Sequence, residues 1–137
     1  MIYRAAAAAD VDACLALEWT RSADDLRWHV DGRLLFVADD GDAIVAYARL
    51  ESFWVPMPYL AMIVVRDGVR GREIGSSLLR HICDDLRARG FTWLMSSTTA
   101  GEPLPRRWHL RNGFVEIGRL AGLNRDGGDE AFYRLTL

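Results

Sequence analysis

Three glycines and three arginines gather in one ten-residue run, Arg66-Asp-Gly-Val-Arg-Gly-Arg-Glu-Ile-Gly75. A β-branched apolar run precedes it, and apolar residues at helical spacing, from Ile74 to Leu86, follow it. A helix N-terminus carries unpaired backbone N–H groups and the positive end of the helix dipole, so a glycine-bearing loop that leads into one can bind phosphate. We therefore predict a pyrophosphate cradle. Its expected residues are Arg70, Gly71, Arg72, Glu73, Ile74, Gly75 and Ser76.

Glu73 is an unusual residue for such a cradle. A carboxylate about 4 Å from a pyrophosphate charge would cost about 4 kcal/mol at an effective dielectric of 20. We interpret Glu73 as a residue of the first helical turn, where an acidic side chain complements the dipole and points to solvent. On this interpretation only its backbone N–H contributes to the cradle.

Hydrophobic periodicity predicts the elements that position this loop. Strands are expected near Tyr3 and over residues 34–38, 43–53, 59–65, 91–97, 115–120 and 131–137, with both faces of 91–97 buried at its apolar start. Helices are expected over residues 10–17, 22–32, 72–89 and 105–112, with Asp10 and Ser22 as N-caps. Residues 54–58 are expected to form a loop, because prolines cannot sit in a central strand. This order predicts one α+β domain over residues 1–137, a mixed, mostly antiparallel twisted sheet flanked by helices.

Composition excludes several classes of function. The net charge of −2 argues against a nucleic-acid binder, and no apolar run approaches the roughly 20 residues of a membrane span. We expect a cytoplasmic protein. Cys14 and Cys83 fall on predicted apolar helix faces, where buried thiols are favoured over a disulfide. His29 and His81 have no cysteine or carboxylate at ligand spacing, so no metal site is expected. All 17 basic residues are arginine, which removes the lysine that a P-loop requires.

Two motifs resemble the GNAT superfamily of N-acetyltransferases over nearly the full length of the chain. That family's signature is Arg/Gln-x-x-Gly-x-Gly/Ala between a strand and a helix, and Arg70-Gly-Arg-Glu-Ile-Gly75 matches it except at Glu73. The family also has a short helix that ends in an aromatic pair, three residues and then Gly-Phe. Here this landmark reads Trp108-His-Leu-Arg-Asn-Gly113-Phe114, with His109 in place of the usual tyrosine.

The resemblance implies acetyl-CoA as the acyl donor and a GNAT-like sheet. Its pyrophosphate would lie on the glycine loop, and its pantetheine between strands 59–65 and 91–97, bonded to the backbone of Ile63, Val64 and Val65. Glu102 occupies a place where the family commonly has an asparagine near the cofactor. The acceptor would be a primary amine of a small molecule or a peptide.

The catalytic groups are less sharply indicated. A neutral histidine still carries one ring proton, so His109 could donate it to the departing thiolate; the alternative is a ring that only packs beside Trp108. Glu51 and Glu102 are candidate bases, because strand 59–65 contains no carboxylate. Water relayed to bulk solvent is an equal alternative. We assign His109 and Glu51 as the catalytic candidates.

An aromatic cluster lies beside the expected acceptor site. It consists of Phe53, Trp54, Pro56, Met57, Pro58 and Tyr59, and Trp19 and Trp28 are expected in the helices that wall the site in the resembling family. The cluster suits an apolar acceptor pocket, but core packing or a homodimer interface would use the same residues. A domain that binds acetyl-CoA as a sensor and transfers nothing is the rival interpretation of the whole chain.

Overall fold

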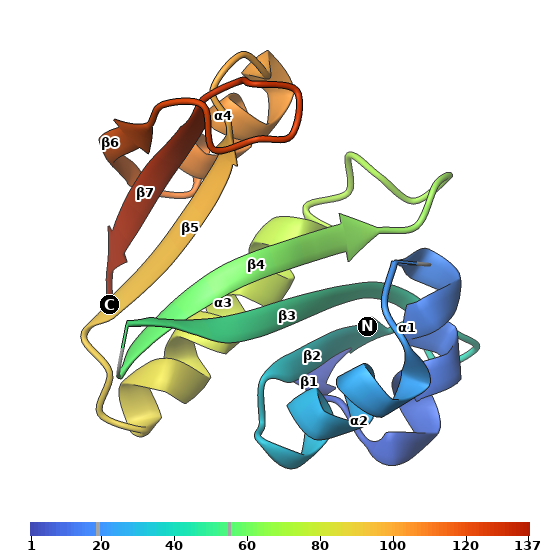
Figure 1. Cartoon of the computed structure of the whole chain (residues 1–137). Helices are drawn as coiled ribbons and strands as arrows, with labels where there is room; N and C mark the ends of the chain where they lie inside the picture. Colours follow the sequence, from blue (N-terminus) through green and yellow to red (C-terminus); the bar gives the residue numbers. More distant parts are fainter. Residues whose placement is uncertain (19, 55) are drawn as a thin grey trace. The chain divides into compact units, whose positions relative to one another are not determined.

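The structure is a computed structural model that describes residues 1–18, 20–54 and 56–137 (Figure 1). Its elements in chain order are β1 (Ile2–Ala5), the 3₁₀ turn η1 (Ala8–Asp10), α1 (Val11–Leu17), α2 (Ala23–Asp31), β2 (Leu35–Asp39), β3 (Ile44–Trp54), β4 (Met57–Val65), α3 (Ile74–Ala88), β5 (Trp93–Thr99), α4 (Pro103–Arg111), β6 (Val115–Leu120) and β7 (Glu130–Thr136). Among these described elements no helix is long and apolar enough to cross a membrane.

Seven strands of the described chain follow the hydrogen-bonded order β1-β2-β3-β4-β5-β7-β6. β4 and β5 pair in parallel at Tyr59↔Met95 and Leu60↔Ser96. The β1–β2, β2–β3, β5–β7 and β6–β7 pairings are antiparallel. The predicted α+β fold with a mixed, mostly antiparallel sheet is therefore confirmed.

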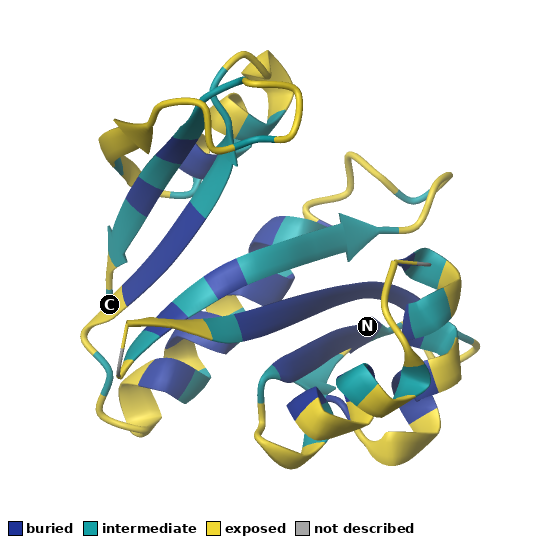
Figure 2. Ribbon diagram, in the orientation of Figure 1, coloured by how far each residue is buried: buried dark blue, intermediate teal, exposed yellow. Residues whose placement is uncertain are grey.

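The chain divides into two compact units, which share β4 and α3. Unit 1 comprises Met1–Glu51 and Ala61–Asp85, and unit 2 comprises Ser52–Leu60 and Leu86–Leu137. In unit 1, helices α1 and α2 cover one face of the strands around a core of Ala6, Val11, Cys14, Leu26, Leu35, Val37 and Tyr47 (Figure 2). Met62 and Val64 of β4 pack against this core.

The other face of the unit 1 strands carries α3. Residues on a strand alternate between faces, so Phe36 points away from its neighbours Leu35 and Val37. The Phe36 ring lies edge-on to the His81 ring of α3, with centroids 6.2 Å apart. Cys14 and Cys83 are both buried and neither forms a disulfide, as predicted.

One of the two predicted N-caps forms. The Ser22 hydroxyl accepts a hydrogen bond of 3.2 Å from the Asp25 N–H at the start of α2. Asp10 stands at the N-cap position of α1, but its carboxylate makes no capping bond. It accepts from the Ala7 N–H at 2.7 Å and pairs with Arg4 at 2.6 Å, which ties β1 to the turn before α1.

The predicted loop 54–58 is wrong at both ends. β3 continues to Trp54 and β4 begins at Met57, so Pro58 is the second residue of a strand. Proline is tolerated there because it lies near the beginning of the strand, before pairing with β5 starts at Tyr59. Val55 lies outside the described residues.

Two other boundaries move because of how helices begin and end. Strand 91–97 begins only at Trp93, since Gly90 and Phe91 complete the end of α3: the Phe91 N–H donates to the Leu86 carbonyl at 3.0 Å. Its start is also not buried on both faces, because Trp93 is 40% exposed. Helix 105–112 begins two residues earlier, at Pro103, where a missing N–H breaks no helical hydrogen bond.

Candidate active site

β4 lies between β3 and β5 in the sheet, and its described pairs with β5 are at Tyr59 and Leu60. Ile63, Val64 and Val65 follow these pairs along the strand and are half-buried. Backbone N–H and C=O groups of a strand can pair with an extended ligand where no neighbouring strand uses them. The pantetheine contacts of these three residues stay a prediction.

The loop after β4 returns sharply to α3. Gly71 has a φ of +78°, a left-handed conformation that favours glycine. The Arg70 side chain lies on its own loop, where Nε donates to the Val65 carbonyl at 3.1 Å and an Nη pairs with Asp67 at 3.2 Å. Arg72 is exposed. Arg70 therefore braces the loop, and Arg72 extends into solvent.

The start of α3 offers several unused backbone donors. Ser77 N–H donates to the Glu73 carbonyl at 2.9 Å. Among the described residues, no hydrogen bond is donated by the backbone N–H groups of residues 71–76. Together with the helix dipole, these groups suit an anion such as a phosphate. The cradle stays a prediction, and this arrangement supports it.

The interpretation of Glu73 as a first-turn helical residue is wrong. α3 begins at Ile74, and Glu73 has a φ of +61°. Left-handed backbone costs a non-glycine residue roughly 1–2 kcal/mol, because Cβ approaches the following carbonyl oxygen. The family signature carries its middle glycine at this position. That glycine suits the left-handed backbone that the turn requires. Glu73 adopts the same turn at an energetic cost.

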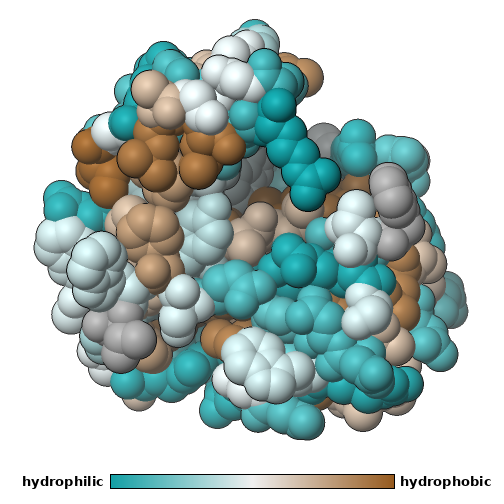
Figure 3. Space-filling view, viewed as in Figure 1, coloured by the Kyte–Doolittle hydropathy of each residue, from teal (hydrophilic) through white to brown (hydrophobic). Residues whose placement is uncertain are grey.

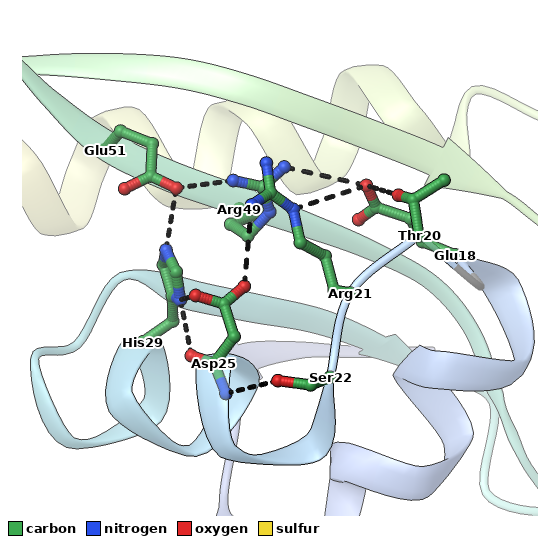
Figure 4. Close-up of polar contacts among 8 residues, drawn as sticks. All are labelled: Glu18, Thr20, Arg21, Ser22, Asp25, His29, Arg49 and Glu51. Atoms are coloured by element: carbon green, nitrogen blue, oxygen red, sulfur yellow. Dashed lines mark hydrogen bonds and ion pairs between the residues drawn. The ribbon is translucent and has the colours of Figure 1, made fainter.

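Glu51 belongs to a cluster of charged side chains in unit 1 (Figure 4). Its Oε1 accepts from His29 Nε2 at 2.8 Å and from Arg49 Nη1. Arg49 is only 2% exposed and also pairs with Glu18, which is 6% exposed, at 3.6 Å. Because alternate residues of β3 share a face, Arg49 and Glu51 lie on the same side of the sheet as the core residue Tyr47.

His29 of α2 has a hydrogen-bond partner at each ring nitrogen. Nδ1 lies 2.7 Å from the Asp25 carbonyl oxygen and Nε2 lies 2.8 Å from the Glu51 carboxylate. Both partners are acceptors, so each of these contacts suits a ring N–H as donor. The Glu51 oxygen is therefore held in place by Arg49 and His29 together. Its catalytic role stays a prediction.

His109 is buried in unit 2, on α4. Its ring stacks on Tyr133 with centroids 4.6 Å apart and meets Phe114 and Trp108 edge-on at 5.1 and 5.2 Å. Nδ1 lies 2.7 Å from the Pro105 carbonyl oxygen, and Nε2 lies 2.7 Å from Ser96 Oγ. Burial lowers the pKa of His109 below its usual 6.5.

These contacts fix the tautomer of the neutral ring. A carbonyl only accepts, so the single ring proton is on Nδ1. The Ser96 hydroxyl has two acceptors, His109 Nε2 at 2.7 Å and the Leu60 carbonyl at 3.2 Å, and the shorter contact gives its proton to Nε2. In this arrangement His109 has no second proton to give to a thiolate. The geometry favours the packing alternative, and a role as general acid stays a prediction.

Glu102 is exposed at the N-cap of α4. Its carbonyl accepts from the Arg106 N–H at 3.4 Å, and its N–H donates to the Thr99 carbonyl at 3.1 Å. Its side chain makes no capping bond. Its predicted contact with the cofactor therefore stays a prediction.

The aromatic cluster predicted beside the acceptor site belongs to unit 2. Phe53 lies 5.7 Å from Tyr59 and 5.5 Å from Phe132, measured between ring centroids. Trp54 is 76% exposed. A groove of about 230 Å³ lies here, lined by Phe53, Met95, Ile117, Gly118, Arg119, Leu120 and Phe132. Brown, hydrophobic residues gather at the upper left of Figure 3, where Figure 1 shows β6 and β7. Phe53, Ile117 and Leu120 are among the exposed apolar residues.

Trp28 and Trp19 were expected to wall the acceptor site. Trp28 is 62% exposed and lies edge-on to His29 in unit 1, with centroids 5.0 Å apart. Trp19 lies outside the described residues. Pocket and dimer interface both remain predictions for the aromatic cluster.

Sequence reasoning missed the partners of the candidate catalytic residues. Arg49 could have been found, because it stands two residues before Glu51 and so shares its strand face. His29 and Ser96 could not, because neither is close in sequence to the residue it contacts. The sequence spacing between His29 and Glu51 does not predict that α2 and β3 come into contact at these residues.

The sequence pattern of the acetyltransferase (GNAT) family matches residues 5–114. The match covers more than half of the chain, so the chain belongs to this family of enzymes, as the two motifs indicated. No curated protein sequence matches the chain.

Solved structures share the fold. Ribosomal-protein-alanine N-acetyltransferase from Brucella melitensis is 24% identical with a TM-score of 0.85, and each chain is covered over 100% of its length. The structure of yncA from Salmonella typhimurium with its cofactor acetyl-CoA is 18% identical with a TM-score of 0.85, over 100% of this chain and 94% of that one. The NatC complex bound to Gag peptide and CoA is 14% identical with a TM-score of 0.82, over 99% and 98%. At these identities the likeness shows the fold.

Replacing Glu73 tests the strain in the loop. We expect Glu73→Gly to raise the free energy of unfolding by about 1 kcal/mol, because glycine adopts a positive φ without steric cost. Glu73→Ala is the matched control, since it removes the carboxylate but keeps Cβ, and it should give no such gain. Urea denaturation of the three proteins measures the difference. Equal stability of the glycine and alanine variants would contradict the strain argument.

The lowered pKa of His109 predicts an acid-dependent loss of stability. Below its usual pKa of about 6.5 the unfolded chain binds a proton that the folded ring resists, so stability falls as pH falls below that value. The slope should approach about 1.4 kcal/mol per pH unit. In His109→Phe this component should vanish, and in the control His81→Phe it should persist. Denaturation series between pH 5 and 7.5 measure it; an unchanged slope in His109→Phe would refute the assignment.

Proposed function

We propose that this chain transfers an acetyl group from acetyl-CoA directly to a primary amine of a small molecule or a peptide. The observation that carries the proposal is the start of α3 in unit 1. There the end of β4 leads through left-handed backbone at Gly71 and Glu73 into backbone N–H groups that donate to no described residue. Family membership makes acetyl-CoA the natural ligand for this arrangement.

The residues present fit such a ligand. The amides of residues 71–76 would bind the pyrophosphate, and Arg72, exposed beside them, would add a positive charge. Backbone groups of Ile63, Val64 and Val65 would hold the pantetheine in an extended form, and one N–H there would polarise the thioester carbonyl. Catalysis would then arise mainly from orientation of the two reactants.

Direct transfer is favoured over an acetylated cysteine. Cys14 is buried, and burial raises the pKa of its thiol to about 12, so the reactive thiolate is not formed near neutral pH. Cys83 is buried as well. A route in which the amine attacks the thioester itself needs neither thiol.

The nature of the acceptor rests on likeness alone. Two of the proteins with this fold are described with a protein or peptide: the ribosomal-protein-alanine enzyme, and the NatC complex bound to Gag peptide. The same fold cannot by itself name a substrate. We therefore propose an amine of either kind, acting within a single acyltransferase domain over residues 1–137.

A sensor that binds acetyl-CoA without transferring the group is the second candidate. Two observations favour it: β4 carries no carboxylate, and the one ring proton of neutral His109 is held by the Pro105 carbonyl. The two functions differ in turnover but not in binding.

An amine panel separates these functions. We expect the purified chain to release free thiol from acetyl-CoA in the presence of at least one small-molecule or peptide amine, with the acetylated amine detected by mass spectrometry. Calorimetric binding of acetyl-CoA with no thiol release from any amine would support the sensor. No binding at millimolar acetyl-CoA would refute both.

The cradle itself is tested by a matched pair of glycine variants. Gly71 and Gly41 have φ values of +78° and +98°, and a Cβ added at either meets nothing within 4 Å. Alanine should therefore strain both turns to a similar degree. We expect Gly71→Ala to raise the Kd for acetyl-CoA about tenfold, since its methyl group would crowd an approaching phosphate, about 1.4 kcal/mol in binding. Gly41→Ala should leave the Kd unchanged. Equal affinities would remove residue 71 from the cradle.

A further inference from the structure

Three polar side chains of unit 2 form a directed chain of hydrogen bonds. Tyr59 Oη lies 2.5 Å from Ser97 Oγ, and Ser97 Oγ donates to Glu130 Oε2 at 2.7 Å. A carboxylate only accepts, so the single hydroxyl proton of Ser97 points to Glu130. The phenol of Tyr59 must then donate to Ser97. Both protons are aligned toward the carboxylate.

The chain crosses three neighbouring strands on one face. Tyr59 is opposite Met95 in the β4–β5 ladder, and Ser97 is opposite Phe132 in the β5–β7 ladder. Residues 95 and 97 share a face because strand side chains alternate. Ser96, which bonds His109, points to the other face. The polar chain is therefore separate from the buried His109 cluster.

The apolar groove described above lies on the same face. Met95 and Phe132 line it, and the Phe53 ring contacts the rings of both Tyr59 and Phe132. Tyr59, Ser97 and Glu130 are each half-buried, so solvent and small ligands can reach this face. An apolar surface beside a polar chain that leads to a carboxylate can hold an amine by its carbon skeleton and receive a proton from it.

We propose that Tyr59, Ser97 and Glu130 form a proton relay that takes the proton from the acceptor amine during transfer. This inference rests on the proposed function. β4 itself carries no carboxylate, and the relay connects the amine to the Glu130 carboxylate through the hydroxyl groups of Tyr59 and Ser97. Tyr59 is then the catalytic residue, because it contacts the amine. Ser97 and Glu130 act through it.

The step conserves atoms and charge. As the amine nitrogen bonds to the acetyl carbon, one N–H bond breaks and its proton passes to the Tyr59 oxygen. The Tyr59 proton passes to Ser97 and the Ser97 proton to Glu130, which becomes a neutral carboxylic acid. The carbon–sulfur bond breaks with its electron pair on sulfur, which takes a proton from solvent. Glu130 afterwards returns its proton to solvent.

The surroundings of Glu130 suit this role better than those of Glu51. The described hydrogen bonds to the Glu130 carboxylate come from neutral donors: Ser97 on Oε2 and the Asn124 amide on Oε1 at 3.3 Å. Glu51 Oε1 accepts from Arg49 and from His29. An arginine has no acceptor atom through which to pass a proton on, whereas a hydroxyl such as that of Ser97 both accepts and donates.

Three conservative variants test the relay by rate. Tyr59→Phe, Ser97→Ala and Glu130→Gln should each lower kcat about 100-fold, a loss typical of a missing general base, while the Kd for acetyl-CoA stays within twofold. The double variant Tyr59→Phe with Glu130→Gln should be no slower than either single variant, because the loss of one member already stops proton transfer through the relay. Tyr47→Phe is the control: it removes a buried hydroxyl with no partner among the described residues of unit 1 and should keep full turnover.

A spectroscopic measurement tests the direction of the chain without turnover. In Glu130→Gln the amide can donate to Ser97, which can then donate to the Tyr59 oxygen and stabilise the phenolate. The ultraviolet titration of Tyr59, isolated as the difference from Tyr59→Phe, should move to lower pH in the Glu130→Gln background. A purely structural role for Glu130 would not produce this shift.

The outcomes separate this inference from the function on which it rests. If the unaltered chain acetylates an amine and the three variants keep its kcat, the relay is wrong and the function stands. The relay is also wrong if kcat falls only together with acetyl-CoA affinity and the unfolding midpoint, or if the Tyr59 titration does not move. If the unaltered chain turns over no amine, the function and the relay are both overturned.

Discussion

The structure depends most on the backbone N–H groups at the start of α3, which have no hydrogen-bond partner in the described chain. The turn into α3 leaves the N–H groups of residues 71–76 without a described acceptor, and it does so through left-handed backbone at Gly71 and Glu73. Such a turn is energetically costly at Glu73. A ligand that accepts these hydrogen bonds would offset that cost. The unpaired main-chain groups of this loop are therefore the reason that a diphosphate site is predicted here.

Each unit holds a polar network of a different kind. In unit 1 the network is ionic: Glu18, Arg49, Glu51 and His29 hold one another at short distances in a largely buried site. Removing one member of such a cluster leaves a buried charge without its partner, which is strongly destabilising. The side chains therefore stay in this arrangement. In unit 2 the networks are mostly neutral, with hydroxyl groups between a ring or a phenol and an acceptor. Neutral hydroxyl chains can reverse or pass their protons, and fixed ion pairs cannot.

Periodicity predicted the elements well and their ends less well. The helix before Gly90 and the strands around it were expected, but Phe91 is used to complete the helix end rather than to begin β5. Pro58 was read as a strand breaker, although near the beginning of β4 its missing N–H is tolerated. At Glu73 the error was larger: a side chain that suits a helical first turn stands on left-handed backbone. Local propensity favours one conformation, and the closure of the loop between β4 and α3 imposes another.

By itself the sequence determined the family, the order of strands and helices, and the place of the loop at residues 70–76, because glycine positions and hydrophobic spacing are local properties of the chain. Only the tertiary structure decided what the polar side chains do. It placed both nitrogens of His109 against partners, set Glu51 between Arg49 and His29, and aligned Tyr59 and Ser97 toward Glu130. Apart from the short-range contacts of His109 with Pro105 and of Glu51 with Arg49, these contacts join residues 13 to 38 positions apart. Strand register and helix packing bring such residues together, and neither is written in the local sequence.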